Sequence, residues 1–175
     1  LSFDLSVYDI FGLLAAGGTI VFPKQEEVKN SKHWLDLVQK YEITLWNTVP
    51  QLASLFMDEV EENHNELSLR VFLLSGDWID TALPGKLKEK FKKSVIVSLG
   101  GATEGSIWSI WHEINYVDQS WDKIPYGRAM PNQEIWILNH ALENCPVGVR
   151  GDIYIGGLGV ALNYYKNELQ TNESF

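Results

Sequence analysis

The sequence predicts an α/β fold: a mostly parallel sheet with flanking helices, followed by a β-rich segment that resembles part of a barrel. Short apolar, β-branched runs recur along residues 1–113, and stretches with helical spacing separate them. Strands that alternate with helices require right-handed crossovers and therefore pair in parallel. Residues 114–175 instead alternate apolar and polar positions between Gly and Pro turns, which is typical of antiparallel strands. We therefore expect an α/β piece at 1–113 and a β-rich piece at 114–175.

Four strands are expected in the parallel layer. Each is a short apolar run, and the first is closed by a proline, which suits a buried strand. The predicted strands are Thr19–Pro23, Ile43–Val49, Arg70–Ser75 and Ser94–Leu99.

Three helices are expected between these strands, at Ser31–Tyr41, Gln51–Glu61 and Pro84–Lys92, the last with a solvated basic face. In the β-rich piece, alternation predicts strands at Glu134–Asn139 and Gly151–Gly157. The glycines at 156, 157 and 159 suggest a phosphate loop, but turn chemistry and the lack of a following helical pattern favour a simple turn.

Composition narrows the classes of function. The chain has 175 residues, of which 45% are hydrophobic and 21% charged, as in an ordinary globular domain. Its 14 basic and 23 acidic residues give a net charge of −9, so nucleic acid and anionic membrane surfaces are disfavoured as partners. The single cysteine, Cys145, fits a reducing cytosol. No run approaches the ~18 apolar residues of a membrane helix. We interpret the chain, which opens inside an apparent motif, as a piece of a longer protein.

Small and polar residues follow the predicted parallel strands where each strand ends. Asn47 lies late in its strand, Ser75-Gly76-Asp77 follows the third, and Gly100-Gly101-Ala102-Thr103-Glu104 follows the fourth. The carboxyl ends of parallel strands form the usual ligand crevice, so we expect a site there. Glu104 is a candidate ligand for Mg²⁺, which prefers carboxylate oxygen. The alternative is a plain strand-to-helix turn in which Thr103 caps the helix.

Asp4 stands among apolar residues, between Phe3 and Leu5. A partly buried carboxylate is costly unless it is paired. Two roles remain open on spacing alone: a helix N-cap, or a counter-ion for the ammonium group of a ligand.

Together these motifs resemble the amino-acid adenylation domains of nonribosomal peptide synthetases. Phe3–Phe11 is similar to the family's Phe-Asp-x-Ser motif, Leu99–Glu104 to its Tyr-Gly-Pro-Thr-Glu motif, and Gly151–Phe175 to its Gly-Glu-Leu-x-Ile motif. Gly100 stands where many members have a tyrosine that stacks on adenine, so base stacking must come from elsewhere or be weak. The family's phosphate loop would precede Leu1, and its catalytic lysine would follow Phe175. This part alone is therefore not expected to be a competent enzyme.

The resemblance implies a substrate pocket. Asp4 matches the aspartate that pairs with the α-ammonium of the amino acid. The full set of implied pocket residues, named below, resembles the pocket signature of cysteine-activating domains. In it, the side chains of Asn47 and Ser75 offer hydrogen bonds to a thiol. Those polar groups would disfavour a plain hydrocarbon, which would leave them unpaired. The implied pocket residues are Asp4, Leu5, Tyr8, Asn47, Leu73, Ser75, Leu99, Ile107 and Trp108.

The resemblance also implies the chemistry: ATP with Mg²⁺ activates the amino acid, which then passes to the phosphopantetheine thiol of a carrier protein. Thr103 and Glu104 would be catalytic and Glu104 would hold the metal, while Gly76, Gly100, Gly101 and Thr103 would contact the nucleotide. An acyl- or aryl-CoA ligase of the same superfamily is an alternative, although Asp4 argues against an ammonium-free substrate. A third hypothesis, beside the adenylation domain and the CoA ligase, is a non-catalytic binding module.

Overall fold

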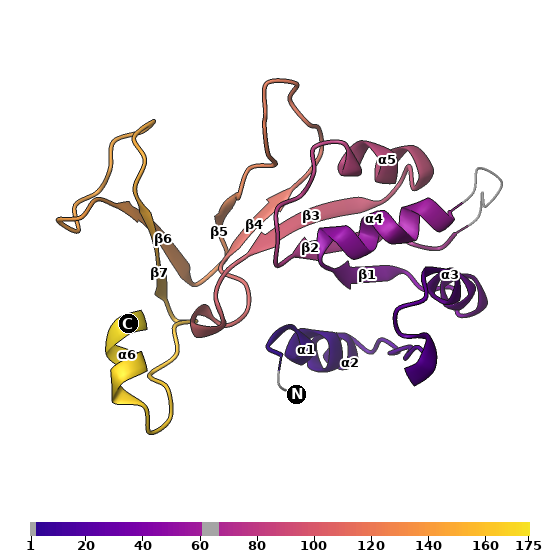
Figure 1. Cartoon of the computed structure of the whole chain (residues 1–175), viewed down its shortest axis with the longest axis horizontal. Coiled ribbons are helices and arrows are strands. Elements are labelled where there is room, and N and C mark those ends of the chain that lie inside the picture. The colour runs from indigo at the N-terminus through magenta and orange to yellow at the C-terminus, as the bar shows by residue number, and fades with distance from the viewer. Residues whose placement is uncertain (1–2, 61–66) are drawn as a thin grey trace. The chain divides into compact units, whose positions relative to one another are not determined.

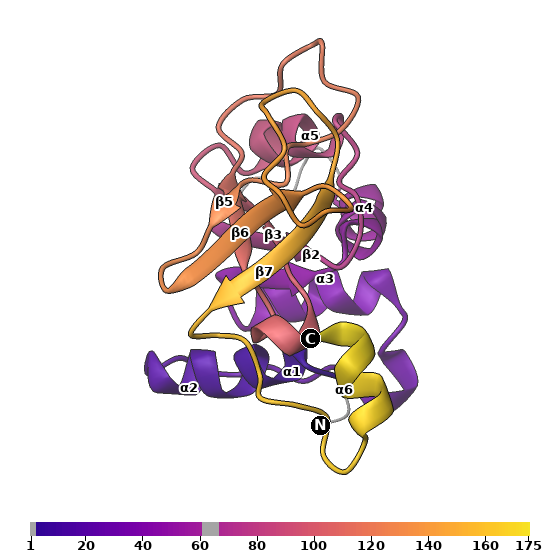
Figure 2. The same ribbon diagram turned by 90° about the vertical axis from the view of Figure 1, so that its left-hand side faces the viewer.

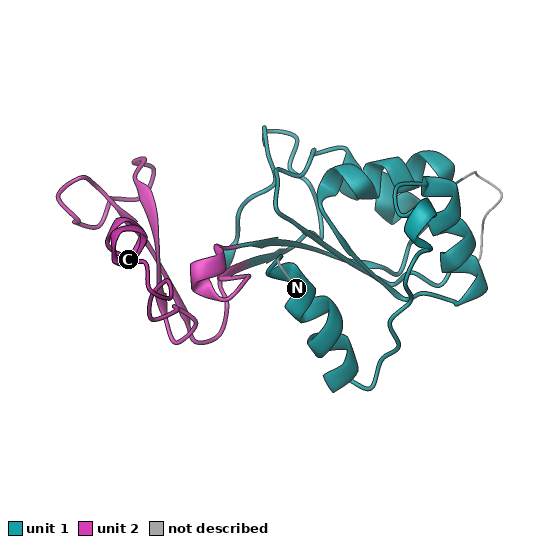
Figure 3. Ribbon diagram, turned by 60° about the horizontal axis from the view of Figure 1, so that its bottom comes forward, with its two compact units in different colours: residues 1–100, 111–128 teal, residues 101–110, 129–175 magenta. Residues whose placement is uncertain are grey.

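The structure is a computed structural model that describes residues 3–60 and 67–175. The chain forms two compact units, residues 1–100 with 111–128, and residues 101–110 with 129–175 (Figure 3). The division into pieces 1–113 and 114–175 stays a prediction. No helix in the described ranges is long and apolar enough to cross a membrane.

The first unit is built on a sheet whose strand order is β1-β2-β3-β4-β5 (Figure 1). Its first three strands pair in parallel, which confirms the predicted fold class. Three of the four predicted parallel strands form, with slightly narrower bounds. The two short strands β4 and β5 were not predicted. The strands are β1 (Leu45–Thr48), β2 (Val71–Ser75), β3 (Val95–Gly100), β4 (Ile110–Glu113) and β5 (Arg128–Ala129).

All three predicted helices form. They are α3 (Ser31–Lys40), α4 (Pro50–Glu59) and α5 (Leu83–Lys90). Proline at the first turn of α4 explains why that helix begins one residue earlier than predicted, because its missing N–H would have no partner there. Glu61, the predicted end of α4, lies outside the described residues.

The core of the first unit lies on the face of the sheet that α4 and α5 cover. Phe72 and Leu74 alternate along β2 and are fully buried, as is Ile96 of β3. Phe56 from α4 and Leu87 from α5 pack in the same cluster. Side chains alternate between faces along a strand, so residues 73, 75 and 99 belong to the opposite face.

The first residues form a continuous helical run of α1 (Leu5–Val7), the π-helical turn η1 (Tyr8–Gly12) and α2 (Leu13–Ala15). The strand predicted at Thr19–Pro23 is wrong. Those residues form no ladder with any described strand, and Phe22 is 74% exposed. An apolar run becomes a strand only when a neighbour supplies backbone hydrogen bonds, and the sheet ends at β1. The single turn η2 (Gln25–Glu27) follows.

The second unit contains the antiparallel pair β6 (Gln133–Leu138) and β7 (Asp152–Gly157), which confirms both predicted strands (Figure 2). It also holds the short turn η3 (Thr103–Gly105) and helix α6 (Glu168–Ser174). At the end of β7, Gly157 has a φ of +99° and is followed by a turn, as expected, and not by a helix.

Candidate functional site

Four of the predicted pocket residues share one face of the parallel sheet. Asn47 pairs with Leu73 in the β1–β2 register, and Ser75 pairs with Leu99 in the β2–β3 register. Paired residues in adjacent strands point to the same side, and positions 73 and 75 alternate with the core residue Leu74. The structure therefore brings Asn47, Leu73, Ser75 and Leu99 together on one face toward the carboxyl ends of the strands, the edge at which α/β sheets bind ligands.

Two polar atoms on this face are buried without a hydrogen bond. Within residues 3–60 and 67–175, nothing donates to Asn47 Oδ1, and Ser75 Oγ has no partner. Ser75 is only 3% exposed. A buried polar atom without a partner costs about 1–3 kcal/mol and is rare in folded proteins. Two of them on paired strands mark a surface suited to a polar ligand group.

Asp9 fixes the orientation of the Asn47 amide, a contact that sequence reasoning missed. Nδ2 of Asn47 donates to Oδ1 of Asp9 at 2.6 Å. An ionised carboxylate can only accept, so it takes the NH₂ side of the amide. The remaining atom, Oδ1, is an acceptor and calls for a ligand group that donates.

Asp4, Leu5 and Tyr8 lie together on the N-terminal helical run. Oδ1 of Asp4 accepts a hydrogen bond from the backbone N–H of Leu5 at 2.8 Å, so the N-cap interpretation is confirmed. Capping occupies one carboxylate oxygen and leaves the negative charge in place, so it is compatible with a role as counter-ion. Tyr8 opens the π-helical turn, a feature frequent at functional sites, and its ring packs against Gly12.

Gly76 and Gly100 are the residues that follow the paired Ser75 and Leu99. Gly76 has a φ of +83°, which favours glycine, and turns the chain out of β2. Asp77 holds this turn, because its two carboxylate oxygens accept from Gln51 Nε2 at 2.6 Å and from the Trp78 N–H at 2.7 Å. The two glycines leave bare backbone at the predicted nucleotide edge.

The segment after β3 folds back on itself in the second unit. A side chain at Gly101 would lie 2.6 Å from the Ile107 carbonyl oxygen, so only glycine fits there. Thr103 and Glu104 lie in η3, a single 3₁₀ turn whose N-cap is Ala102. The alternative in which Thr103 caps a helix is therefore wrong: the segment is too short and turns away at Ser106.

Glu104 is tied to the C-terminal part of its own unit. The hydroxyl of Tyr164 donates to Glu104 Oε1, and the backbone N–H of Ala161 donates to the Glu104 carbonyl at 2.7 Å. Tyr164 was not singled out from the sequence, where no spacing links it to position 104. These bonds position the Glu104 carboxylate without neutralising its charge.

Ile107 and Trp108 close the turn. Ser106 and Ile107 have φ values of +64° and +74°, a left-handed conformation that is unusual for non-glycine residues and most unusual for a β-branched one. Such strain persists only where surrounding contacts enforce it, and it clusters at functional sites. Here Ser106 Oγ donates to the Gly159 carbonyl at 2.5 Å, and Trp108 is half-buried.

The residues present fit Mg²⁺ as an ion that arrives with a nucleotide. No three His, Cys, Asp or Glu side chains within the described ranges cluster as a metal cage. Mg²⁺ commonly takes only one or two carboxylates and completes its shell with water and substrate phosphates. Glu104 offers one such carboxylate.

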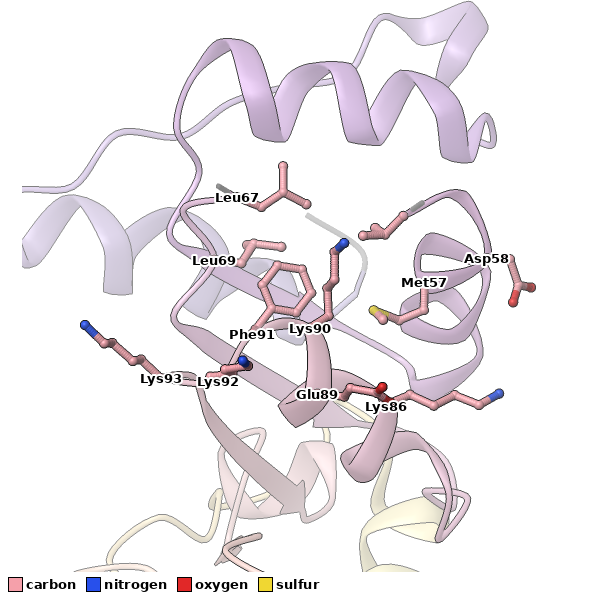
Figure 4. Close-up of a pocket in the computed structure, with 11 residues that line it drawn as sticks. Met57, Asp58, Leu67, Leu69, Lys86, Glu89, Lys90, Phe91, Lys92 and Lys93 are labelled. Carbon is pink, nitrogen blue, oxygen red and sulfur yellow. The ribbon is translucent and has the colours of Figure 1, made fainter. Parts of the chain in front are cut away.

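A separate hollow of about 1060 Å³ lies between the C-terminal ends of α4 and α5 (Figure 4). Leu69 and Lys93, which line it, precede β2 and β3, so the hollow lies at the amino ends of these strands. In Figure 4, Lys86 and Lys93 extend outward, which confirms the solvated basic face. This hollow is not part of the predicted site at the carboxyl ends.

Known proteins are similar to the chain over its full length. Bacitracin synthase 1 of Bacillus licheniformis is 46% identical over 176 residues, covering all of this chain and 3% of that protein. Pyochelin synthetase PchF of Pseudomonas aeruginosa is 43% identical over 177 residues, covering all of this chain and 10% of PchF. The chain thus spans a small part of these relatives.

Solved structures give the same picture. The nonribosomal peptide synthetase FmoA3 superposes with a TM-score of 0.94 at 37% identity, covering 100% of this chain and 19% of FmoA3. Its α-methyl-L-serine-AMP bound form superposes with a TM-score of 0.91 at 38% identity, covering 97% of this chain and 20% of that one.

The family model of AMP-binding enzymes matches residues 1–165, which include every predicted site residue. The chain belongs to the AMP-binding enzyme family, with its relatives among the nonribosomal peptide synthetases.

Proposed function

We propose that residues 1–175 are the central part of an adenylation domain that activates an amino acid with ATP. The amino-acid carboxylate attacks the α-phosphorus of ATP, the bond to the β-phosphate oxygen breaks, and pyrophosphate leaves. The aminoacyl-AMP then passes to the phosphopantetheine thiol of a carrier protein, with release of AMP. Such transfers depend chiefly on positioning and on neutralising charge.

The substrate we propose is L-cysteine. The observation that carries this proposal is the pair of unpartnered buried atoms, Asn47 Oδ1 and Ser75 Oγ, on one face of the sheet. A thiol can donate to the first and exchange a hydrogen bond with the second, while Leu73 and Leu99 supply an apolar surround. Asp4 pairs with the α-ammonium.

The roles of the remaining residues follow the same proposal. Glu104 holds Mg²⁺ against the phosphates, and Thr103 contacts phosphate. The bare backbone of Gly76, Gly100 and Gly101 lets the nucleotide approach closely. From the family resemblance, we assign Leu5, Tyr8, Ile107 and Trp108 to amino-acid binding as well.

Serine is the second candidate, because the FmoA3 structure holds an α-methyl-L-serine adenylate and a hydroxyl also donates. An acyl- or aryl-CoA ligase is less well supported, since a carboxylic acid without an ammonium group gains nothing from Asp4.

The test is amino-acid-dependent exchange of pyrophosphate into ATP by the complete enzyme that contains residues 1–175. We expect exchange to be strongest with cysteine and to be lost in Asp4→Ala. A matched acidic control is Asp36→Ala on α3. Exchange strongest with another amino acid would keep adenylation and overturn the cysteine assignment. No exchange with any amino acid would overturn the proposed function.

A further inference from the structure

The geometry points to Tyr126 as the side chain on which the adenine ring of the nucleotide stacks. This inference rests on the proposed function, in which the protein binds ATP. Tyr126 lies in the segment between β4 and β5, far along the chain from the Gly100 edge. Neither its position nor its motif singled it out in the sequence.

The ring of Tyr126 occupies the space that a side chain at Gly100 would fill. A Cβ atom at Gly100 would lie 2.4 Å from Tyr126 Cε2, 2.5 Å from Cζ and 2.7 Å from the hydroxyl oxygen. Real Cβ atoms do not approach other atoms so closely, so any larger residue at position 100 would displace the ring. The Tyr126 ring can therefore occupy this position only because residue 100 has no side chain.

The backbone around Tyr126 is built to hold the ring there. Gly127 has a φ of +112°, and a Cβ on it would lie 2.1 Å from the Trp111 carbonyl oxygen. The chain therefore crosses β4 in a close approach that only glycine permits, directly beside Tyr126. Pro125, on the other side, restricts the backbone further.

The ring remains available to a ligand. Tyr126 is 41% exposed although it packs on the end of β3. It lies at the carboxyl end of β3, next to the bare backbone of Gly100. Gly76 follows Ser75, which pairs with Leu99 in the neighbouring strand, so the backbone there also carries no side chain. An open aromatic ring beside side-chain-free backbone suits a flat heterocycle, because every base presents a π-face that stacks on aromatic side chains.

The first experiment measures binding of adenosine 5′-(α,β-methylene)triphosphate, an ATP analogue whose α–β link cannot be cleaved, to the complete enzyme by calorimetry. We expect Tyr126→Leu to raise its Kd roughly tenfold, as the loss of one stacked base does. Tyr126→Phe keeps the ring and should keep the affinity. Inorganic tripolyphosphate has no base, so its inhibition of pyrophosphate exchange should be unchanged in both variants. An unchanged Kd in Tyr126→Leu, or an equal loss for tripolyphosphate, would overturn the inference.

A second experiment exchanges the two positions and remains informative if Tyr126→Leu is unstable. Gly100→Tyr alone puts two rings in one space, so we expect it to weaken binding of the analogue. Gly100→Tyr combined with Tyr126→Ala leaves one ring at that edge and should recover most of the affinity. If the double variant binds no better than Gly100→Tyr, the two residues do not share a function and the inference is wrong.

These outcomes separate this inference from the proposed function. Binding of the ATP analogue does not require an amino acid. If the enzyme binds the analogue through Tyr126 but no amino acid supports pyrophosphate exchange, the stacking role of Tyr126 stands and the proposed reaction is wrong. An enzyme that binds no ATP analogue would overturn both.

Discussion

Two side chains on the β1–β3 sheet and two in the loop around Glu104 differ in their hydrogen bonds. On the sheet, Asn47 Oδ1 and Ser75 Oγ are buried with no partner in the described ranges. In the loop that carries Glu104, Ser109 Oγ donates to the Gly105 carbonyl at 3.1 Å, and Tyr164 donates to Glu104, whereas elsewhere in the same unit Gln133 Oε1 is buried without a partner among the described residues. The difference supports the proposed ligand role of the sheet face, whereas Glu104 is held by contacts within its own unit.

The two units also differ in how they bury apolar side chains. The first has a core around Phe56 and Phe72, both fully buried. No residue from 129 to 175 is buried, and Ile153 and Tyr154 on β7 are 50% and 43% exposed. Apolar burial is the dominant stabilising term, so the free energy of unfolding should depend mainly on the first unit.

The largest expected effect tests this difference in burial. Phe72→Ala should lower the free energy of unfolding by about 3–5 kcal/mol, because it removes a fully buried ring. The centroid of this ring lies 5.1 Å from that of the Phe91 ring. Tyr154→Ala removes an aromatic ring of similar size from β7 and should cost about 1 kcal/mol or less. Urea denaturation followed by tryptophan fluorescence measures both. Equal losses would contradict the comparison.

The second prediction concerns the charge held in the loop. Glu104→Gln keeps the side chain's size and its acceptor oxygen for Tyr164 but removes the negative charge. We expect pyrophosphate exchange by the complete enzyme to fall about 100- to 1000-fold, the range seen when one electrostatic contact to a transition state is lost. Glu113→Gln, on the end of β4, is the matched control and should retain activity. Full activity of Glu104→Gln would remove this residue from the proposed metal site.

The third prediction compares two buried serines, one from each unit. Ser75→Ala removes an unpartnered hydroxyl and should leave the free energy of unfolding unchanged or slightly higher. Ser109→Ala removes a bonded hydroxyl and should lower it by about 1 kcal/mol. The preference for cysteine over 2-aminobutyrate, which lacks the thiol, should fall about 5- to 150-fold in Ser75→Ala only, as expected for a lost hydrogen bond of about 1–3 kcal/mol. A loss of stability in Ser75→Ala without loss of preference would contradict a ligand-binding role.

The smallest effect is on pH dependence. The side-chain hydroxyl and backbone N–H of Ser120 lower the pKa of Asp118. A lowered pKa in the folded state stabilises the protein at neutral pH, and that contribution is lost as the pH falls through the lowered pKa. Ser120→Ala should shift the pKa of Asp118 upward, toward its ordinary value, in an NMR titration. Because Asp118 is fully exposed, the acid stability of the chain should hardly change.

Much of the fold could be predicted because periodicity reports burial. The strands at 71–75 and 95–100 are apolar runs buried in a parallel sheet, and their bounds were nearly correct. Thr19–Pro23 has the same local pattern yet forms no strand, since pairing depends on a neighbour that local sequence does not specify. The short strand β4 is only four residues long and carries too little pattern to predict.

The candidate site divides in the same way. Asn47 and Ser75 could be placed at the strand ends because the carboxyl ends of parallel strands meet at one edge. Asp9, Tyr126 and Tyr164 could not be predicted, because each acts through one contact across 26 to 60 residues of chain: with Asn47, Gly100 and Glu104 respectively. Such contacts leave no periodic signal in a single sequence.

The central claim is that the unpartnered atoms at Asn47 and Ser75 form a pocket for a side chain that donates a hydrogen bond. The most direct measurement is competitive inhibition of the complete enzyme by two unreactive adenylate mimics, the 5′-O-sulfamoyl adenosines of cysteine and of 2-aminobutyrate. The mimics differ only in the thiol. We predict that the cysteine compound binds at least about tenfold more tightly, corresponding to about 1.4 kcal/mol. Equal inhibition constants would contradict the account.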